Sequence, residues 1–356
     1  MIVHTNVSLS AHTTFRIGGV VSYLLVIESL ESAEFVQVVE FAESKKLPMF
    51  VLGGGSNLLV SDEPLNIIVL KIAPQKKVEY AERENDVLCV AGGGESWDEV
   101  VADAVAHNYG GIENLSLIPG TVGAAPVQNI GAYGVELADV LEWVEVFDVR
   151  EKKMRVLSVA ECELGYRSSI FKKSEGKKYI VTRVAMRLSR GASPNISYKD
   201  LATHFQPRVL SEGFVPAISD VRDVVMAIRR VKLPDPATTP NAGSFFKNPV
   251  ITAAHGKDLA ARFPGLPLFP VKESGGEYVK TSAAWIIDHV CGLRGAIRGS
   301  VGTFETQPLV IINRGDATAK DVATFSDEII SAVKEKTNII LEPEVEFISA
   351  RTFSKK

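Results

Sequence analysis

The sequence predicts a globular protein of mixed helices and strands, arranged as three blocks along its 356 residues. Short apolar runs of strand length alternate with stretches in which apolar residues recur at helical spacing. The composition agrees with this prediction, since 46% hydrophobic and 23% charged residues are typical of an ordinary soluble protein. A chain of this length has room for two or three domains with ample core.

The first block extends from the N-terminus to about residue 71. Its strands are expected at residues 24–27, 48–52 and 66–70. A helix between the first two strands is indicated by apolar residues at i, i+3, i+4 and i+7, namely Phe35, Val38, Val39 and Ala42.

The second block begins with a strand at 87–91, and the helix after it opens with a capping box from Ser96 to Glu99. Further strands are expected at 141–149, 153–157 and 179–188. In the last of these, alternation places Arg183 and Arg187 on one face and Thr182, Val184, Met186 and Leu188 on the other. The second helix buries Val100, Val101, Ala104 and Val105.

The third block covers about 211–336, after a stretch at 191–194 that resembles a hinge. Helices are expected at 219–230, 282–291 and 319–335, and a strand pair at 338–341 and 344–348 ends the chain. The last helix has one apolar face, formed by Val322, Phe325, Ile329 and Val333.

Charge and cysteine content exclude several classes of protein. Lys plus Arg is 39 and Asp plus Glu is 43, so a net charge of -4 offers no basic face for nucleic acid. The N-terminus has no signal-peptide pattern, and no apolar run approaches the ~18 residues that span a bilayer. We therefore expect a cytoplasmic protein with no membrane insertion and no metal site. Its cysteines lie outside any CxxC pair and are expected to be buried thiols in a reducing compartment: Cys89, Cys162 and Cys291.

The segment 119–133 (PGTVGAAPVQNIGAY) carries no charge and little bulk. Its glycines and alanines leave the backbone accessible to a flat ligand, and Gln128 and Asn129 are its strong side-chain donors and acceptors. We interpret the segment as a wall against a planar cofactor. A tightly packed loop is the alternative.

Two glycine runs add to this interpretation. The strand at 48–52 leads directly into 53–57 (GGGSN), where successive backbone amides can form a concave nest for a diphosphate. The second run, 92–94, precedes a helix but has Trp97 where the third glycine of a Rossmann fingerprint belongs. Each run alone is equally consistent with a tight turn, but together they favour a dinucleotide held without a Rossmann unit.

Four side chains are candidates for chemistry on the substrate. Arg167 lies among aromatic and apolar neighbours, so it suits a carboxylate clamp, although a structural salt bridge explains it equally well. Ser244, after two small residues and before two phenylalanines, can donate a proton to a strongly basic carbanion or enolate, or can cap a turn. Glu344 can polarise a substrate or be a solvated edge carboxylate, and Lys232 can bind an anion or serve the helix dipole. No G-x-S-x-G surrounds Ser244, which disfavours a nucleophilic hydrolase.

Six segments together resemble the MurB family, the UDP-N-acetylenolpyruvoylglucosamine reductases of bacterial peptidoglycan synthesis. They occur in order over nearly the whole chain: GGGSN at 53–57, PGTVGAAPVQNIGAYG at 119–134, GYRSSIF at 165–171, KLPDP at 232–236, NAGSFFKNP at 241–249 and LEPEV at 341–345. Residues 197–201 (SYKDL) look like the tyrosine-bearing loop of the longer family branch.

The resemblance implies an α+β fold with a two-part FAD-binding domain of the vanillyl-alcohol-oxidase type and a C-terminal α+β substrate-binding domain. Residues 1–71 would form FAD subdomain 1, with strands 337–350 packing back on it. Residues 72–205 would form FAD subdomain 2, and 211–336 the substrate domain.

The resemblance also implies roles for individual residues. Arg167, Ser244 and Glu344 match the family's catalytic positions. The positions that match substrate contacts are Tyr133, Tyr198, Lys232 and Asn248. The FAD positions are Gly53, Gly54, Gly55, Ser56, Asn57, Pro119, Gly120, Gly123, Gln128, Asn129, Gly131 and Arg229.

The implied activity is NADPH-dependent, FAD-mediated reduction of the enolpyruvyl double bond of UDP-N-acetylglucosamine enolpyruvate to UDP-N-acetylmuramate, by a monomer. Two departures leave substrate contacts open: Phe269 stands where some relatives have a tyrosine, and 300–307 lacks a histidine common in the family. A flavin-dependent oxidase of the same fold family and a non-catalytic nucleotide-binding protein are the alternatives.

Overall fold

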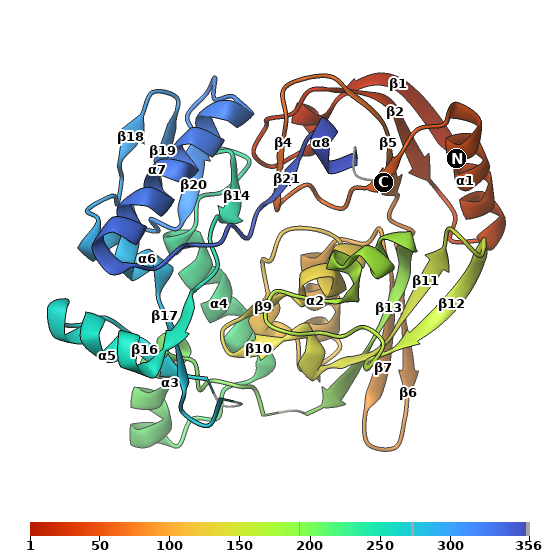
Figure 1. Ribbon diagram of the computed structural model, residues 1–356. Coiled ribbons are helices and arrows are strands. Elements are labelled where there is room, and N and C mark those ends of the chain that lie inside the picture. Colours follow the sequence, from red (N-terminus) through yellow and green to blue (C-terminus); the bar gives the residue numbers. More distant parts are fainter. Residues whose placement is uncertain (192, 272–273, 354–356) are drawn as a thin grey trace. The chain divides into compact units, whose positions relative to one another are not determined.

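Helices and short strands make up two units in the computed structural model, which describes residues 1–191, 193–271 and 274–353 (Figure 1). Unit 1 contains Met1–Val7, Val21–Gly54 and Asn66–Arg230. Unit 2 contains Ser8–Val20, Gly55–Leu65 and Val231–Lys356. Helices combined with mainly antiparallel sheets confirm the predicted α+β class.

A four-stranded sheet with one covering helix begins unit 1. Helix α1 (Ser32–Lys45) packs on this sheet through Phe35, Val38 and Val39, so the predicted helical face is confirmed. Phe35 also stacks on Phe147 of the neighbouring sheet, with 5.3 Å between ring centroids. The strands lie in the order β1 (Ile2–Ser8), β2 (Val20–Ile27), β5 (Leu65–Ile72) and β3 (Met49–Val51).

A larger antiparallel sheet forms the second half of unit 1. Helix α2 (Trp97–Ala106) packs Val100, Val101 and Ala104 against the buried side of this sheet. The predicted shared face on the long strand is confirmed, because Val184, Met186 and Leu188 belong to the same core. The strands follow the order β12 (Lys153–Ser158), β11 (Leu141–Asp148), β13 (Tyr179–Arg190), β7 (Val87–Gly92) and β6 (Val78–Glu82), and β8 (Tyr109–Gly110) pairs with the end of β13.

The predicted capping box at the start of α2 is wrong. Ser96 is the N-cap residue, but its side chain makes no capping hydrogen bond. The backbone N–H of Trp97 instead donates to the Gly120 carbonyl at 3.1 Å. The first backbone N–H of the helix is therefore satisfied by the carbonyl of a distant loop.

The rest of unit 1 consists of short elements and a helical pair. Helix α3 (Lys199–Glu212) and helix α4 (Ile218–Lys232) share a small core that includes Leu201, Phe205, Val221 and Val225. Helix α3 was not predicted from the sequence; it contains Pro207, a residue that usually interrupts helices. The predicted hinge includes residue 192, which lies outside the described residues. The short elements are η2 (Glu113–Leu115), η3 (Val122–Gln128), β9 (Gly131–Ala132), β10 (Val135–Glu136), η4 (Leu137–Asp139), η5 (Ile170–Lys172) and η6 (Ser174–Lys178).

Unit 2 contains two antiparallel sheets and a parallel strand pair. Helix α7 (Ala319–Thr337) buries Val322, Phe325, Ile329 and Val333 in its core, as predicted. The first sheet is β14 (Asn241–Ser244), β20 (Val310–Asn313), β19 (Val301–Thr303) and β18 (Ile297–Arg298). The second is β15 (Val250–Thr252), β17 (Tyr278–Thr281) and β16 (Leu268–Pro270), and the parallel pair is β4 (Leu58–Val60) with β21 (Glu346–Ile348). The remaining elements are η1 (Leu9–His12), α5 (Ala253–Arg262), α6 (Ala283–Trp285), which continues as a π-helix over Ile286–Val290, and α8 (Ala350–Phe353).

The C-terminal strand pair is predicted only in part. Residues 338–341 form no strand, because Asn338 ends α7 in the left-handed conformation and Ile339 and Leu341 then pack into the core without a ladder. β21 pairs with β4, which is far away in sequence. Pro343 has no N–H to donate, which limits pairing just before that strand.

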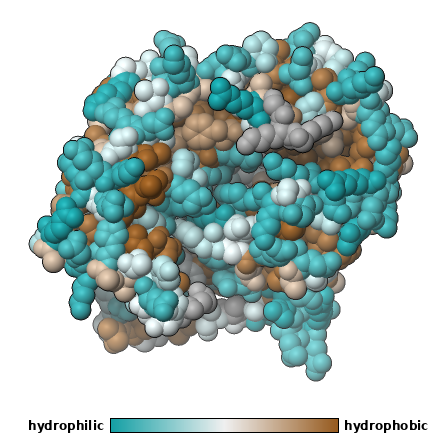
Figure 2. All heavy atoms as spheres, in the orientation of Figure 1, coloured by the Kyte–Doolittle hydropathy of each residue, from teal (hydrophilic) through white to brown (hydrophobic). Residues whose placement is uncertain are grey.

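The surface shown in Figure 2 is mainly hydrophilic, and the cysteines are free thiols. Hydrophilic residues cover most of the face that Figure 2 shows. Cys89 and Cys162 are buried free thiols, and Cys291 is a half-buried one. Within the described ranges, none of the helices combines the length and the apolar character needed to cross a bilayer.

Candidate functional site

The first glycine run packs tightly against backbone on both sides. In unit 1, a Cβ on Gly54 would lie 2.7 Å from the Gly120 Cα, so this close approach requires glycine. In unit 2, Gly55 has a φ of +65°, and a Cβ there would lie 2.1 Å from the His12 carbonyl oxygen. The run 53–57 thus leaves unit 1 and enters unit 2 between two glycines that have no space for a side chain.

The second glycine run has a packing role. Gly93 donates its N–H to the Thr182 carbonyl at 2.7 Å, and its own carbonyl accepts from the Gly123 N–H at 2.9 Å. A Cβ on Gly94 would lie 2.4 Å from the Ala73 carbonyl oxygen. The run 92–94 is therefore the tight turn that the sequence left open as an alternative.

The uncharged segment forms the short helix η3, which ends at Asn129 in the left-handed conformation. The Asn129 side chain is buried and fully engaged within unit 1: its Nδ2 donates to Glu136 and to the Gly165 carbonyl, and its Oδ1 accepts from the Ala138 N–H. Asn129 therefore stabilises the conformation of this segment. Because its side-chain amide is already hydrogen-bonded, Asn129 can contact a ligand only through its backbone.

Arg167 lies against this segment. Its Nη2 donates to the Gly131 carbonyl at 3.0 Å, and its backbone has a φ of +52°. A Cβ on Gly131 would lie in ordinary contact with Arg167 Nη1 at 3.4 Å, but it would clash with Glu136 Cγ at 2.8 Å, so a larger residue would displace the Glu136 side chain. A predicted catalytic residue and a predicted cofactor residue are thus in contact within unit 1.

Arg229 and two tyrosines form a second group in unit 1. Arg229, on α4, donates from Nη2 to the Leu117 carbonyl at 3.2 Å. Its buried Nε has no hydrogen-bond partner among the described residues. The rings of Tyr133 and Tyr198 meet edge to face, with 5.3 Å between centroids. Burial raises the pKa of Tyr133 to about 12, although the nearby Arg229 opposes the rise, so its hydroxyl stays a hydrogen-bond donor at neutral pH.

Ser244 and Glu344 come together in unit 2. Ser244 ends β14, and the next residue, Phe245, accepts a hydrogen bond at its carbonyl from the Glu344 N–H at 2.8 Å. Asn57 Nδ2 donates to the Glu344 carbonyl at 3.1 Å, which brings the end of the glycine run to the same place. The Ser244 hydroxyl is half-buried and makes no hydrogen bond within the described part of the chain, so it caps no turn.

The two other predicted substrate residues also lie in unit 2. The Lys232 carbonyl accepts from Thr306 Oγ1 at 2.9 Å, which ties it to the 300–307 loop. Asn248 Oδ1 accepts from the N–H of Ala283 at the start of α6. Phe269 is 54% exposed on β16, beside Lys280 of β17. Unit 2 therefore holds Ser244, Glu344, Lys232 and Asn248, whereas Arg167, Arg229, Tyr133 and Tyr198 belong to unit 1.

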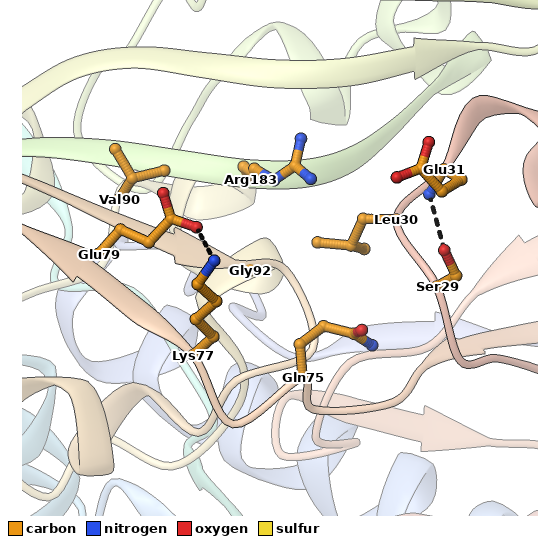
Figure 3. Close-up of a pocket in the computed structure, with 9 residues that line it drawn as sticks. All are labelled: Ser29, Leu30, Glu31, Gln75, Lys77, Glu79, Val90, Gly92 and Arg183. Carbon is orange, nitrogen blue, oxygen red and sulfur yellow. Dashed lines mark hydrogen bonds and ion pairs between the residues drawn. The ribbon is translucent and has the colours of Figure 1, made fainter.

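A shallow pocket of about 190 Å³ in unit 1 contains none of the predicted site residues (Figure 3). Lys77 and Glu79 at its edge form an exposed ion pair of 2.8 Å, and Arg183 pairs with Glu145 at 2.8 Å. These charges are already neutralised by one another. The pocket is lined by Ser29, Leu30, Glu31, Gln75, Lys77, Glu79, Val90, Gly92 and Arg183.

The sequence interpretation missed a charged group beside Arg229. Asp98 of α2 and Arg222 of α4 form an ion pair of 2.7 Å next to residues 116–117. One signal was present, because Arg222 and Arg229 are seven residues apart on a predicted helix and so share a face. Asp98 carried no signal, since an acidic residue in the first turn of a helix is ordinary.

Comparisons with known proteins cover nearly the whole chain. The model for the UDP-N-acetylenolpyruvoylglucosamine reductase C-terminal domain matches residues 235–348, and an FAD binding domain model matches residues 24–156. A UDP-N-acetylenolpyruvoylglucosamine reductase of Ralstonia nicotianae is 38% identical over 94% of this chain and 96% of its own. One of Shewanella sediminis is 38% identical over 98% and 97%. The solved MurB of Thermus caldophilus is 28% identical, with a TM-score of 0.67 over 98% of this chain and 100% of its own.

Proposed function

Because this chain belongs to the UDP-N-acetylenolpyruvoylglucosamine reductase family, we propose that it reduces the enolpyruvyl double bond of UDP-N-acetylglucosamine enolpyruvate. The product is UDP-N-acetylmuramate, a precursor of peptidoglycan, and the reductant is NADPH. The observation that carries this proposal is the alignment at 38% identity over nearly the full length of both chains. The match to an FAD binding domain supplies the cofactor.

Two features of unit 1 suit FAD. The buried Arg229 Nε has an unused N–H among the described residues, which suits an anionic diphosphate. The segment 119–133 is uncharged, and a flat ring system can approach its backbone. The chemistry that FAD supplies when bound is hydride transfer from NADPH to the terminal carbon of the enolpyruvyl group. We propose that it is held by Gly53, Gly54, Gly55, Ser56, Asn57, Pro119, Gly120, Gly123, Gln128, Asn129, Gly131 and Arg229.

Three side chains would act on the substrate once hydride reaches its terminal carbon. Negative charge then develops on the carbon that bears the carboxylate, and Arg167 would stabilise it with its planar guanidinium. Glu344, while protonated, would donate a hydrogen bond to the carboxylate. The Ser244 hydroxyl would give its proton to the same carbon, which completes the lactyl ether. Among the described residues, none accepts a hydrogen bond from this hydroxyl. This supports the role, because the O–H is then available to the substrate carbon.

The UDP-sugar would be bound by Tyr133, Tyr198, Lys232 and Asn248. Phe269 cannot donate a hydroxyl hydrogen bond, so any diphosphate contact near β16 would have to come from another group. We further propose that the enzyme works as a monomer in the cytoplasm, where UDP-sugars and NADPH are available. The net charge of -4 supports the absence of a nucleic-acid partner. We retain three parts, 1–71 with 337–350, 72–205 and 211–336, as the proposed domain division.

An anaerobic absorbance titration of the flavin band tests the function. NADPH should bleach the band, and UDP-N-acetylglucosamine enolpyruvate should restore it. Recovery only after oxygen is admitted would contradict the proposal and indicate an oxidase. Bound FAD that NADPH never bleaches would indicate a non-catalytic nucleotide-binding protein.

A further inference from the structure

Three separate segments of unit 1 meet at one ion pair. Arg222 of α4 holds Asp98 of α2 with two parallel hydrogen bonds, from Nη1 to Oδ1 at 2.7 Å and from Nη2 to Oδ2 at 3.2 Å. Nη1 of the same guanidinium also donates to Ser116 Oγ at 2.9 Å. The arginine and the carboxylate are 12% and 26% exposed, so solvent screens this pair less than an exposed one.

The residue next to this pair has an unfavourable backbone conformation. Leu117 has a φ of +56°, which a leucine rarely adopts. Its N–H donates to Asp98 Oδ1 at 2.7 Å, and its carbonyl accepts from Arg229 Nη2 at 3.2 Å. The backbone N–H and carbonyl of the strained residue are therefore both held by charged side chains. These hydrogen bonds stabilise a backbone conformation that is otherwise unfavourable.

Leu117 leads directly into the uncharged segment that begins at Pro119. The direction in which that segment leaves Leu117 depends on the Leu117 backbone angles. Arg222 and Arg229 lie on one face of α4, two helical turns apart, and both guanidinium charges act on the Asp98 carboxylate. Both cations help to keep the pKa of Asp98 below its ordinary value although burial raises it.

We propose that Asp98 and Arg222 form a clamp that positions residues 117–120 and the Arg229 guanidinium, and thereby sets the affinity for FAD. The inference rests on the proposed function, because it takes the loop and Arg229 as parts of the FAD site. Asp98 and Arg222 are positioning residues: they act through Leu117 and Arg229. The observation that separates this clamp from an ordinary ion pair is the strained peptide held at both ends.

The test measures FAD binding to flavin-depleted protein by the change in flavin fluorescence. Asp98→Asn keeps the shape but removes the charge, and Arg222→Lys keeps the charge but removes the fork. We expect Asp98→Asn to raise the Kd for FAD about tenfold or more and Arg222→Lys to raise it by less. At saturating FAD, the kcat for the enolpyruvyl substrate should stay within about threefold, because neither residue is proposed to contact the reacting atoms.

Asp148 provides a matched control in the same unit. It is buried, pairs with Lys178 at 2.9 Å and accepts two backbone N–H groups, from Arg150 and Glu151. None of these hydrogen bonds reaches residues 116–131. Asp148→Asn should lower the melting temperature of the flavin-depleted protein at least as much as Asp98→Asn does, but should leave the FAD Kd within about twofold.

A double variant separates a clamp from two independent effects. If the pair acts as one unit, Asp98→Asn combined with Arg222→Gln should weaken FAD binding no more than the worse of the Asp98→Asn and Arg222→Gln single variants, measured in the same way. A Kd for Asp98→Asn or Arg222→Lys equal to that of the Asp148→Asn control would overturn the clamp. A wild-type protein that binds FAD but never reduces the enolpyruvyl substrate would instead overturn the proposed function, and would leave the FAD-affinity result standing.

Discussion

At the scale of the single residue, Ser244 is the proposed proton donor, and its half-buried hydroxyl has no hydrogen-bond partner among the described residues. In Ser244→Ala, NADPH should reduce the flavin at the wild-type rate. Reoxidation by the enolpyruvyl substrate should slow by about 100-fold or more, as expected for loss of a general acid. Stopped-flow absorbance separates the two half-reactions, and the first serves as the internal control. An unchanged second half-reaction would remove Ser244 from the role.

Arg167 is expected to matter for its shape as well as its charge. Lysine in its place would lose the planar fork and one charge-assisted hydrogen bond, about 2 kcal/mol or roughly 30-fold in kcat/KM. FAD content should fall less, because a lysine amine can also donate to the Gly131 carbonyl that Arg167 contacts. Arg183→Lys, at an ion pair elsewhere in unit 1, is the control. Parallel loss of FAD and turnover would point to a structural arginine.

At the scale of the element, the two helix starts of α7 and α2 differ in a way that stability measurements can detect. Thr318 and Asp321 form a reciprocal capping box at the start of α7, whereas Ser96 makes no side-chain cap at α2. Thr318→Ala should therefore lower the free energy of unfolding by about 1 kcal/mol. Ser96→Ala is the matched control and should change it by less than about 0.5 kcal/mol. Urea titrations give both values, and an equal loss would contradict the assignment.

At the scale of the whole molecule, stability should fall in acid. Burial raises the pKa of Asp98 and Asp148, but Arg222 on Asp98 and Lys178 on Asp148, with backbone N–H groups, outweigh it, so both values lie below the ordinary range. Their contribution is complete above the unfolded-state pKa of about 3.9 and is lost as the pH falls through the lower folded-state values.

Urea unfolding between about pH 6 and pH 2.5 tests this expectation. The free energy of unfolding should decline below about pH 4. Asp148→Asn should be less stable at neutral pH and should show a shallower decline, because the asparagine does not titrate. A decline of the same steepness in the variant and the wild type would rule out Asp148 as a contributor.

Features that depend on neighbours along the chain could be predicted from the sequence. The helical spacing of Phe35, Val38 and Val39 predicted α1, and that of Val322, Phe325 and Ile329 predicted α7, because a helix buries residues that are three and four apart. The small-residue segment and the position of Ser244 among phenylalanines could also be interpreted locally. The family followed from six motifs in order, which the relatives at 38% identity confirm.

Features that depend on contacts between distant segments became visible in the folded chain and could not be predicted from the sequence. β21 pairs with β4, the Trp97 N–H donates to the Gly120 carbonyl, and Asp98 meets Arg222 across 124 positions of sequence. No local pattern marks these contacts, because each residue alone is ordinary for its element. Their physical reason is three-dimensional: backbone groups and charges removed from water must find partners wherever the fold brings them.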